Sequence, residues 1–234
     1  MPLNSQEAMR QSMMTEAAYQ SDLDYVAPRN CSKCSRLFQF IESQKTHHPD
    51  WYNGAVPAFG DITSEILIVG LAPGLRGANA TGRPFTGDFA GETLYDALIK
   101  HGFASGEYAR HQEDGLTLHN TRITNAVKCV PPQNKPTSQE VNQCRDSYLI
   151  DELRRMTNLK VILALGGVAH KALVKTFDKK QADFPFEHGR CHQITGTLRL
   201  LDSYHCSRYN VNTNRLTVEM FDDIMTKLTK LVSK

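Results

Sequence analysis

Short apolar runs rich in β-branched residues alternate along the chain with longer stretches in which apolar residues recur at helical spacing. The continuous apolar runs are typical of strands that are covered on both faces. They predict strands over residues 65–70, 121–127, 160–165 and 198–204, with a further extended piece near 192–195. Strands that alternate with helical segments form a parallel sheet with helices on both faces. We therefore predict a three-layer α/β/α fold with a central parallel sheet of about four strands.

The stretches between these strands predict four helices, over residues 91–101, 138–156, 168–177 and 216–231. Thr137 and Ser138 precede Glu140, which is a typical capping arrangement for the second of them. The first thirty residues are polar and weakly helical, and no repeat or linker divides the rest. We expect a polar helical extension over residues 1–27 and a single domain over residues 28–234.

Composition and charge narrow the class of protein only slightly. With 234 residues, 40% hydrophobic and 22% charged, the chain can bury a core without cross-links. Its 27 basic and 25 acidic residues give a net charge of +2, which does not by itself indicate nucleic-acid binding. The longest uncharged apolar run, residues 66–75, is half of the roughly 20 residues that a bilayer span requires. We expect no membrane association and a cytoplasmic location.

Four of the six cysteines form a candidate metal site: Cys31, Cys34, Cys129 and Cys144. The first two make a C-x2-C pair, and the other two lie far downstream, separated by fourteen residues. Four thiolates suit either tetrahedral zinc or an iron–sulfur cluster, and the ligand chemistry does not choose between them. Four unrelated buried thiols are a third interpretation, because only the first pair has a recognised ligand spacing. Cys191 and Cys206 are assigned to packing or strand ends.

Polar loops follow three of the predicted strands. The first loop, residues 70–88, contains five glycines and two prolines but lacks the G-K-[ST] ending of a phosphate-binding loop. The second strand ends near Asn125, whose amide offers a donor and an acceptor to a nucleobase edge, although a lone Asn there is commonly a turn former. His205 begins the polar loop after the fourth strand. Because the carboxyl ends of parallel strands meet at one edge, these loops predict a shared ligand site.

Taken together, four motifs resemble the uracil-DNA glycosylase superfamily, and within it the family 5 branch of bacterial and archaeal enzymes with an iron–sulfur cluster. They are GLAPG at 70–74, TGRPFTGD at 81–88, NAVKCVPPQNKPT at 125–137 and HCSRYNVNTNRLT at 205–217. The resemblance covers about residues 28–232. It implies a uracil-DNA glycosylase-like fold and a 4Fe-4S cluster on the four cysteines, with zinc as a minor alternative.

The resemblance also implies an activity and its partners. The chain is expected to be a monofunctional enzyme that excises uracil from DNA by hydrolysis of the N-glycosidic bond, initiating base excision repair. Related branches also process hypoxanthine and other deaminated bases. DNA carrying such a base is the expected partner, and the enzyme is expected to be a monomer.

Matching the motifs position by position gives the implied site residues. The catalytic residues are Asp88, Asn125 and His205. The substrate-binding residues are Gly70, Leu71, Ala72, Pro73, Gly74, Phe85 and Asn125. The DNA-binding residues are Arg208, Tyr209, Asn210 and Arg215. The four cysteines complete the set as metal ligands.

One departure bears on the roles of these residues. Family 4 carries an acidic residue in its first motif, written GEAPG, where this chain has Leu71. In family 5 an aspartate in the following loop takes its place, and Asp88 matches that position. The implied mechanism has Phe85 stacked on a flipped-out uracil, His205 stabilising the negative charge on the leaving base, and Asp88 facing the cationic sugar and the attacking water.

Two other functions remain open on the sequence. The first is a non-catalytic nucleic-acid-binding module with a four-cysteine metal site. The second is an unrelated nucleotide-using enzyme of doubly wound type, which the missing phosphate-loop lysine disfavours.

Overall fold

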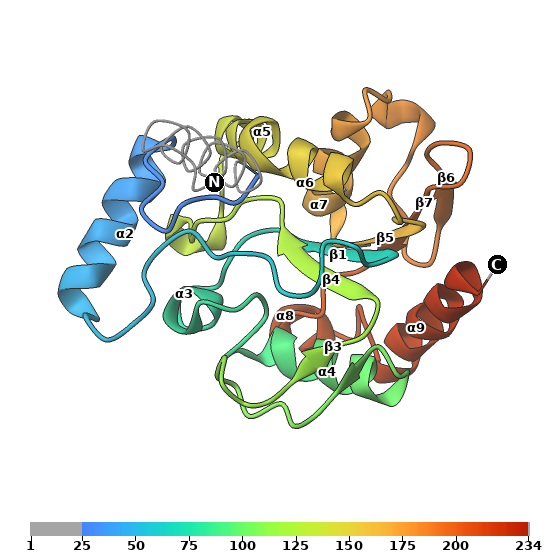
Figure 1. Ribbon diagram of the computed structural model, residues 1–234, viewed down its shortest axis with the longest axis horizontal. Coiled ribbons are helices and arrows are strands. Elements are labelled where there is room, and N and C mark those ends of the chain that lie inside the picture. Colours follow the sequence, from blue (N-terminus) through green and yellow to red (C-terminus); the bar gives the residue numbers. More distant parts are fainter. Residues whose placement is uncertain (1–24, 234) are drawn as a thin grey trace, which may run out of the picture.

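A central sheet with helices on both faces forms the body of the computed structural model, which describes residues 25–233 (Figure 1). The strand order is β4-β1-β5-β7-β6. The strands are β1 Ile66–Gly70, β4 Thr121–Asn125, β5 Val161–Leu165, β6 Cys191–Gln193 and β7 Arg199–Ser203. The first four strands in the order run parallel, and β6 pairs antiparallel with β7 at the edge. The predicted parallel sheet is confirmed, and the predicted extended piece near 192–195 is this short edge strand.

Strand residues alternate between two apolar cores, one on each face of the sheet. Leu67 and Val69 point into one core, while Ile66 and Ile68 point into the other, and all four are fully buried. This double burial explains why the strands appear in the sequence as continuous apolar runs.

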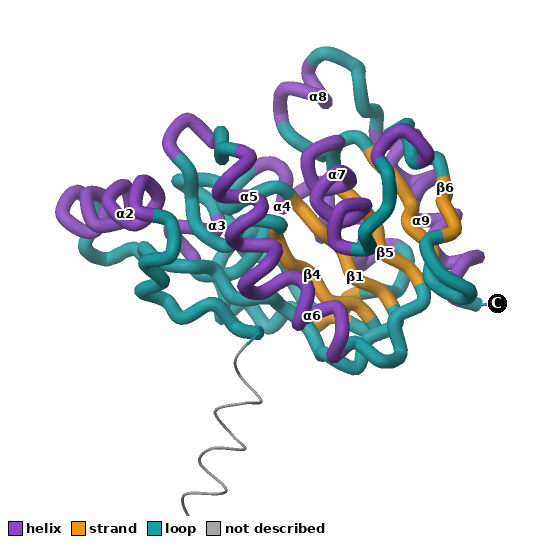
Figure 2. Tube along the Cα trace, turned by 90° about the horizontal axis from the view of Figure 1, so that it is seen from above, coloured by secondary structure: helices purple, strands orange, loops and turns teal. Residues whose placement is uncertain are grey.

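Helices cover the two faces separately (Figure 2). One face carries α5 Ser138–Cys144, α6 Ile150–Arg155 and α7 Gly167–Thr176, and α2 Ser35–His47 packs into the same core from one side of the sheet. The other face carries α4 Phe89–Lys100 and α9 Val218–Val232. A π-helical turn, Arg145–Leu149, joins α5 to α6, so the predicted helix over 138–156 is one rod with a π segment inside it. Thr137 and Glu140 form the predicted capping box.

Smaller elements lie in the connections. They are α3 Ala78–Thr81, α8 Arg208–Asn212, the hairpin strands β2 Ala104–Ser105 and β3 Thr117–Leu118, and 3-10 turns at Pro132–Asn134 and Gln181–Asp183. The sequence did not predict α2, α3 or α8. Residues 1–24 of the predicted helical extension lie outside the described residues, and Ala27, at its end, is buried in the core. No helix in the described part of the chain has the length and apolar character needed to cross a membrane.

The parallel strands end level with one another at their carboxyl edge. Gly70 pairs with Asn125 at the ends of β1 and β4, and Leu165 pairs with Ser203 at the ends of β5 and β7. The loops that follow all four strands therefore start from the same edge, which is where ligands bind in open parallel sheets.

Candidate active site and cysteine pocket

A cavity of about 660 Å³ opens at this edge of the sheet. Its walls come from the loop after β1, the start of α4, the end of β4 and the segment after β7. The predicted residues that line it are Leu71, Ala72, Pro73, Gly74, Phe85, Asp88, Asn125, His205 and Arg208. The four polar or aromatic residues on which the predicted mechanism depends, at 85, 88, 125 and 205, thus surround one hollow.

Gly70, Phe85 and Asn125 form one tightly packed group, in which Phe85 and Asn125 line the cavity and Gly70 contacts them without lining it. A Cβ atom on Gly70 would collide with the Asn125 amide oxygen and the Phe85 ring, so only glycine fits there. The Asn125 side chain is 3% exposed, and its Oδ1 atom has no hydrogen-bond partner among the described residues. A buried acceptor without a partner is costly, which makes this amide ready for a ligand that donates a hydrogen bond.

Buried charge holds the loop that carries Phe85. The two terminal nitrogens of Arg83 each donate to an oxygen of Asp114 at 2.7 Å, and Nε donates to the Thr86 hydroxyl at 2.8 Å. Phe85 itself has φ of 52°, an unusual value for a bulky residue. Such backbone strain persists only where the surroundings fix it, and the buried Arg83–Asp114 pair supplies that restraint.

Asp88 lies at the N-terminus of α4 and is its N-cap. Its Oδ1 accepts a hydrogen bond from the Gly91 N–H at 3.2 Å, and its Oδ2 lies against Gly74 and Gly77. Burial raises the pKa of Asp88 above its ordinary value, while the backbone donors of α4 oppose this shift. The helix therefore fixes the carboxyl at the cavity wall.

His205 follows β7 on another side of the cavity. Burial lowers its pKa to about 4, so the imidazole is neutral at neutral pH and keeps one N–H to donate. Its ring faces Phe85, with 5.8 Å between ring centroids and 28° between the ring planes. The Asn210 side-chain amide donates to the His205 carbonyl oxygen at 2.8 Å. Asn210 thus holds the His205 backbone, although the sequence predicted a DNA contact for this residue.

The rim of the cavity carries the remaining predicted DNA contacts. Arg208 lies over the Phe89 ring at 5.4 Å, and the side chain of Tyr209 projects from α8 with 71% of its surface exposed. Arg215 lies 4.8 Å from the Tyr204 ring centroid and lines a second hollow of about 240 Å³. This second hollow shares Leu71 and His205 with the first, so the two form one continuous surface.

Sequence reasoning missed two features of this surface. Gly166 and Gly167, at the start of α7, line the second hollow, and a glycine pair directly after a strand was the available signal. Asn134 lines the first cavity from a turn in which Gln133 and Asn134 both have φ of 56°. The sequence signal for this turn is the Asn between prolines in the PPQNKP segment, because Asn tolerates the left-handed conformation.

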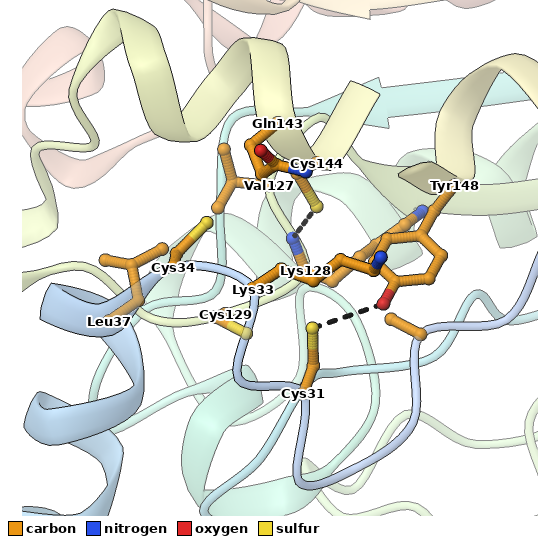
Figure 3. Close-up of a pocket in the computed structure, with 11 residues that line it drawn as sticks. Cys31, Lys33, Cys34, Leu37, Val127, Lys128, Cys129, Gln143, Cys144 and Tyr148 are labelled. Atoms are coloured by element: carbon orange, nitrogen blue, oxygen red, sulfur yellow. Dashed lines mark hydrogen bonds between the residues drawn. The ribbon is translucent and has the colours of Figure 1, made fainter. Parts of the chain in front are cut away.

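The four predicted cysteines line one small apolar pocket on the α2 and α5 side of the molecule (Figure 3). Cys31 lies before α2, Cys34 caps it, Cys129 follows β4 and Cys144 ends α5. The Lys128 N–H lies 3.3 Å from the Cys144 sulfur, and the Tyr148 hydroxyl lies 3.2 Å from the Cys31 sulfur. The two distant sequence pairs are therefore together, which argues against four unrelated thiols.

Electrostatics in this pocket differ from those of isolated cysteines. Burial raises the pKa of Cys144 to about 11 and that of Cys129 further, and the neighbouring cysteines raise the pKa of Cys129 in addition. Four thiolates can therefore coexist here only around a cationic centre. Cys191 lies on β6, and Cys206 is fully buried in the core with its sulfur 3.4 Å from the Ala90 carbonyl oxygen, so neither belongs to this pocket.

The chemistry of the donors bears on the kind of centre. All four side chains offer sulfur, and four thiolates suit either tetrahedral zinc or an iron–sulfur cluster.

The fold and the cavity together define an α/β/α protein whose cavity brings an amide and an aromatic ring together with a carboxyl and a neutral imidazole. The family model of the uracil DNA glycosylase superfamily matches residues 57–229. The chain belongs to this superfamily.

Named relatives agree with this family. A Type-5 uracil-DNA glycosylase of Thermus thermophilus is 39% identical over 207 residues, covering 86% of this chain and 93% of that protein. One of Pyrobaculum aerophilum is 38% identical, with 84% and 86% covered. A Type-4 uracil-DNA glycosylase of the same organism is 33% identical, with 76% and 78% covered. The predicted family is therefore confirmed.

Proposed function

We propose that this chain is a monofunctional uracil-DNA glycosylase that hydrolyses the N-glycosidic bond and so initiates base excision repair. The relatives carry this activity in their names. The observation that carries the proposal is the single cavity lined by Asp88, Asn125 and His205. These three side chains recognise the base, act on the attacking water and stabilise the leaving group, which are the three tasks that the reaction requires.

Recognition of the base rests on Asn125. Uracil presents an N–H donor beside a carbonyl acceptor, and one Asn amide can bond to both. The unpaired Oδ1 of Asn125 is the acceptor that this N–H would satisfy. Phe85 offers its ring for stacking. A base inside a duplex cannot reach this cavity, so the nucleotide must be flipped out, which costs least at a mispaired site.

Breakage of the bond separates charge across the cavity. The bonding electron pair leaves with the base nitrogen, so the sugar acquires oxocarbenium character and the base becomes an anion. The neutral His205 donates a hydrogen bond to the base oxygen, an effect worth about 3 kcal/mol for a well-placed donor in other enzymes. The Asp88 carboxylate faces the cationic sugar and takes a proton from the water that attacks it.

The absence of an amine nucleophile indicates that the product is an intact abasic site. No lysine is among the described residues that line the cavity, and a Schiff base with the sugar requires such an amine. Treatment of the reacting complex with borohydride should therefore trap no protein–DNA adduct. A stable adduct would contradict the monofunctional assignment.

DNA contacts come from the rim of the two hollows. Arg208 and Arg215 supply positive charge, the start of α7 lines the second hollow, and Tyr209 projects as a wedge for the space that the flipped base leaves. Asn210 supports His205 through its hydrogen bond and so positions a catalytic group.

A 4Fe-4S cluster is the cofactor that the cysteine pocket fits best. Its ligands would be Cys31, Cys34, Cys129 and Cys144, and its contribution when bound is structural. The chain itself connects this pocket to the cavity, because Cys129 lies four residues beyond Asn125. The monomeric state and the cytoplasmic location complete the proposal.

An excision assay tests the proposed activity. Oligonucleotides carrying uracil, hypoxanthine or thymine would be incubated with the wild type and with Asn125→Ala. Loss of the Asn125 amide should reduce excision of uracil most. Asn158→Ala is a matched control, because Asn158 is far along the chain and bonds to the Thr63 carbonyl. Binding of the uracil oligonucleotide without release of any base would favour the non-catalytic binding module instead.

A further inference from the structure

Three buried side chains outside both sites converge on one point. His170 comes from α7, His192 from β6 and Asp202 from β7, and they are 1%, 8% and 0% exposed. Their ligand atoms all lie within 4.8 Å of one another. None of the three lines the active-site cavity or the cysteine pocket.

Counting donors and acceptors at His170 reveals an imbalance. Its Nε2 lies 2.7 Å from the Phe184 carbonyl oxygen, which can only accept, so Nε2 carries the hydrogen. In the neutral ring, Nδ1 then presents a lone pair to Asp202 Oδ1 at 2.7 Å. Two lone pairs that face each other at this distance require a positive species between them.

On the other side of the group, two buried polar atoms are left without partners. His192 Nε2 and Asp202 Oδ2 lie 3.3 Å apart, and neither atom has a hydrogen-bond partner among the described residues. One extra proton on His170 would satisfy only its own contact with Asp202. A metal ion would accept lone pairs from all three side chains at once. We propose that His170, His192 and Asp202 bind one divalent transition-metal ion, with Zn²⁺ as the best match.

The chemistry of the ligands supports this assignment. Two imidazole nitrogens and one carboxylate oxygen are ligands that Zn²⁺ accepts readily. A metal-bound histidine usually donates its other ring N–H to a carbonyl or carboxylate, as His170 does to Phe184. The rings of Phe184 and Phe186 lie 5.4 Å from His192 and 5.5 Å from His170, and they shield the group from solvent.

The position of the group indicates what the ion does. The edge strand β6 is only three residues long, and α7 begins at the second hollow. An ion on these ligands would fasten β6 and α7 to β7, which ends two residues before His205. The site is therefore structural, and it is independent of the proposed glycosylase activity.

Metal analysis of the purified protein tests the assignment. Zinc and iron per chain would be measured in the wild type, in His192→Gln and in the double variant Cys34→Ser/Cys144→Ser. We expect about one zinc per chain in the wild type and a loss of about tenfold or more in His192→Gln, with iron unchanged. The cysteine variant should lose iron and keep zinc. His119→Gln, an exposed histidine bonded to Ser105, is the control and should keep both metals.

A second measurement uses only the wild type, so it does not depend on the folding of a variant. Co²⁺ added to zinc-depleted protein should give visible d–d bands without the thiolate charge-transfer bands that cysteine ligands produce. Equal zinc in the wild type and His192→Gln, zinc that disappears with the cysteines, or Co²⁺ spectra with thiolate bands alone would each overturn the proposal. His170, His192 and Asp202 would then form a buried ionisable group that shares a proton and binds no metal.

Discussion

The active-site cavity and the cysteine pocket share one stretch of chain, residues 125–144, but burial acts on an acid and a base in the cavity and on a set of thiols in the pocket. In the cavity, burial raises the pKa of Asp88 and lowers that of His205, so the carboxyl is harder to ionise and the imidazole is harder to protonate than in water. In the cysteine pocket, burial and neighbouring thiols raise pKa values in the same direction. The cavity can accept a substrate in which charge separates, whereas the pocket needs a cation before its groups can ionise.

The active-site cavity and the cysteine pocket therefore contribute differently to the protein. The groups in the cavity come from three loops at one sheet edge, and we propose that they act on a ligand that comes and goes. The cysteines come from segments that the fold must hold together permanently, and they join the N-terminal segment to α5. Loss of a cavity group should therefore affect chemistry alone, while loss of a cysteine should affect stability first.

The largest expected effect is on chemistry. Asp88→Asn removes the carboxylate that faces the cationic sugar, and we expect the single-turnover rate of uracil excision to fall by about 10²–10³-fold. The N-cap interaction is kept, because Asn caps helices as well as Asp does. Glu92→Gln, one turn along α4, is the matched control. Equal losses in both variants would show that helix charge, and not the cavity carboxylate, is responsible.

Loss of a cysteine should have the next largest effect. Cys144→Ser should lower metal content and thermal stability, and it should weaken excision by about 10-fold through loosening of the Asn125 segment. Thermal unfolding and iron content would be followed together. Cys191→Ser, outside the pocket, should change neither. Full stability and activity in a folded, iron-free Cys144→Ser protein would break the link between the two regions.

A pH profile sharpens the contrast inside the cavity. The pKa of Asp88 is raised, so its carboxylate protonates at a higher pH than an ordinary aspartate, and the excision rate should fall as the pH decreases through that value. His205 has a pKa of about 4, so its imidazole is neutral and able to donate its N–H at neutral pH. Single-turnover rates in Asp88→Asn should be small and nearly independent of pH. An unchanged acid limb in that variant would assign the limb to another group.

The smallest expected effect is at the rim. Arg208→Ala should weaken duplex binding a few-fold and reduce the slope of log affinity against log salt by about 1, because one phosphate contact is lost. Arg154→Ala is the control, since this exposed arginine pairs with Asp151 on α6. Equal losses of excision on duplex and single-stranded substrates would contradict a role for Arg208 in opening the duplex.

The elements that were predicted and those that were missed show how much secondary structure follows from local sequence patterns. The four parallel strands were predictable because both faces are buried and their residues are continuously apolar. Helix α2 was missed because its apolar stripe is narrow, with only Leu37 and Ile41 buried. Helix α8 was missed because its five residues are polar and a Ser207 cap, not an apolar face, starts it.

Site residues were predictable to the extent that they lie in motifs at strand ends. Asp88, Asn125 and His205 follow this rule. The Arg83–Asp114 pair does not, because its partners are separated by thirty-one positions and belong to a loop without periodicity. The hydrogen bond from Asn210 to His205 likewise depends on a turn that only the folded backbone defines.

The sequence by itself determined the α/β order, the sheet edge where ligands bind and the identities of the cavity residues, because these follow from local periodicity and short motifs. Only the tertiary structure decided that the four cysteines meet, that Asn125 has an unpaired oxygen, and that His170, His192 and Asp202 converge. Each of these facts is a distance between residues far apart in the chain. Such distances arise from the packing of whole layers, and no local pattern records them.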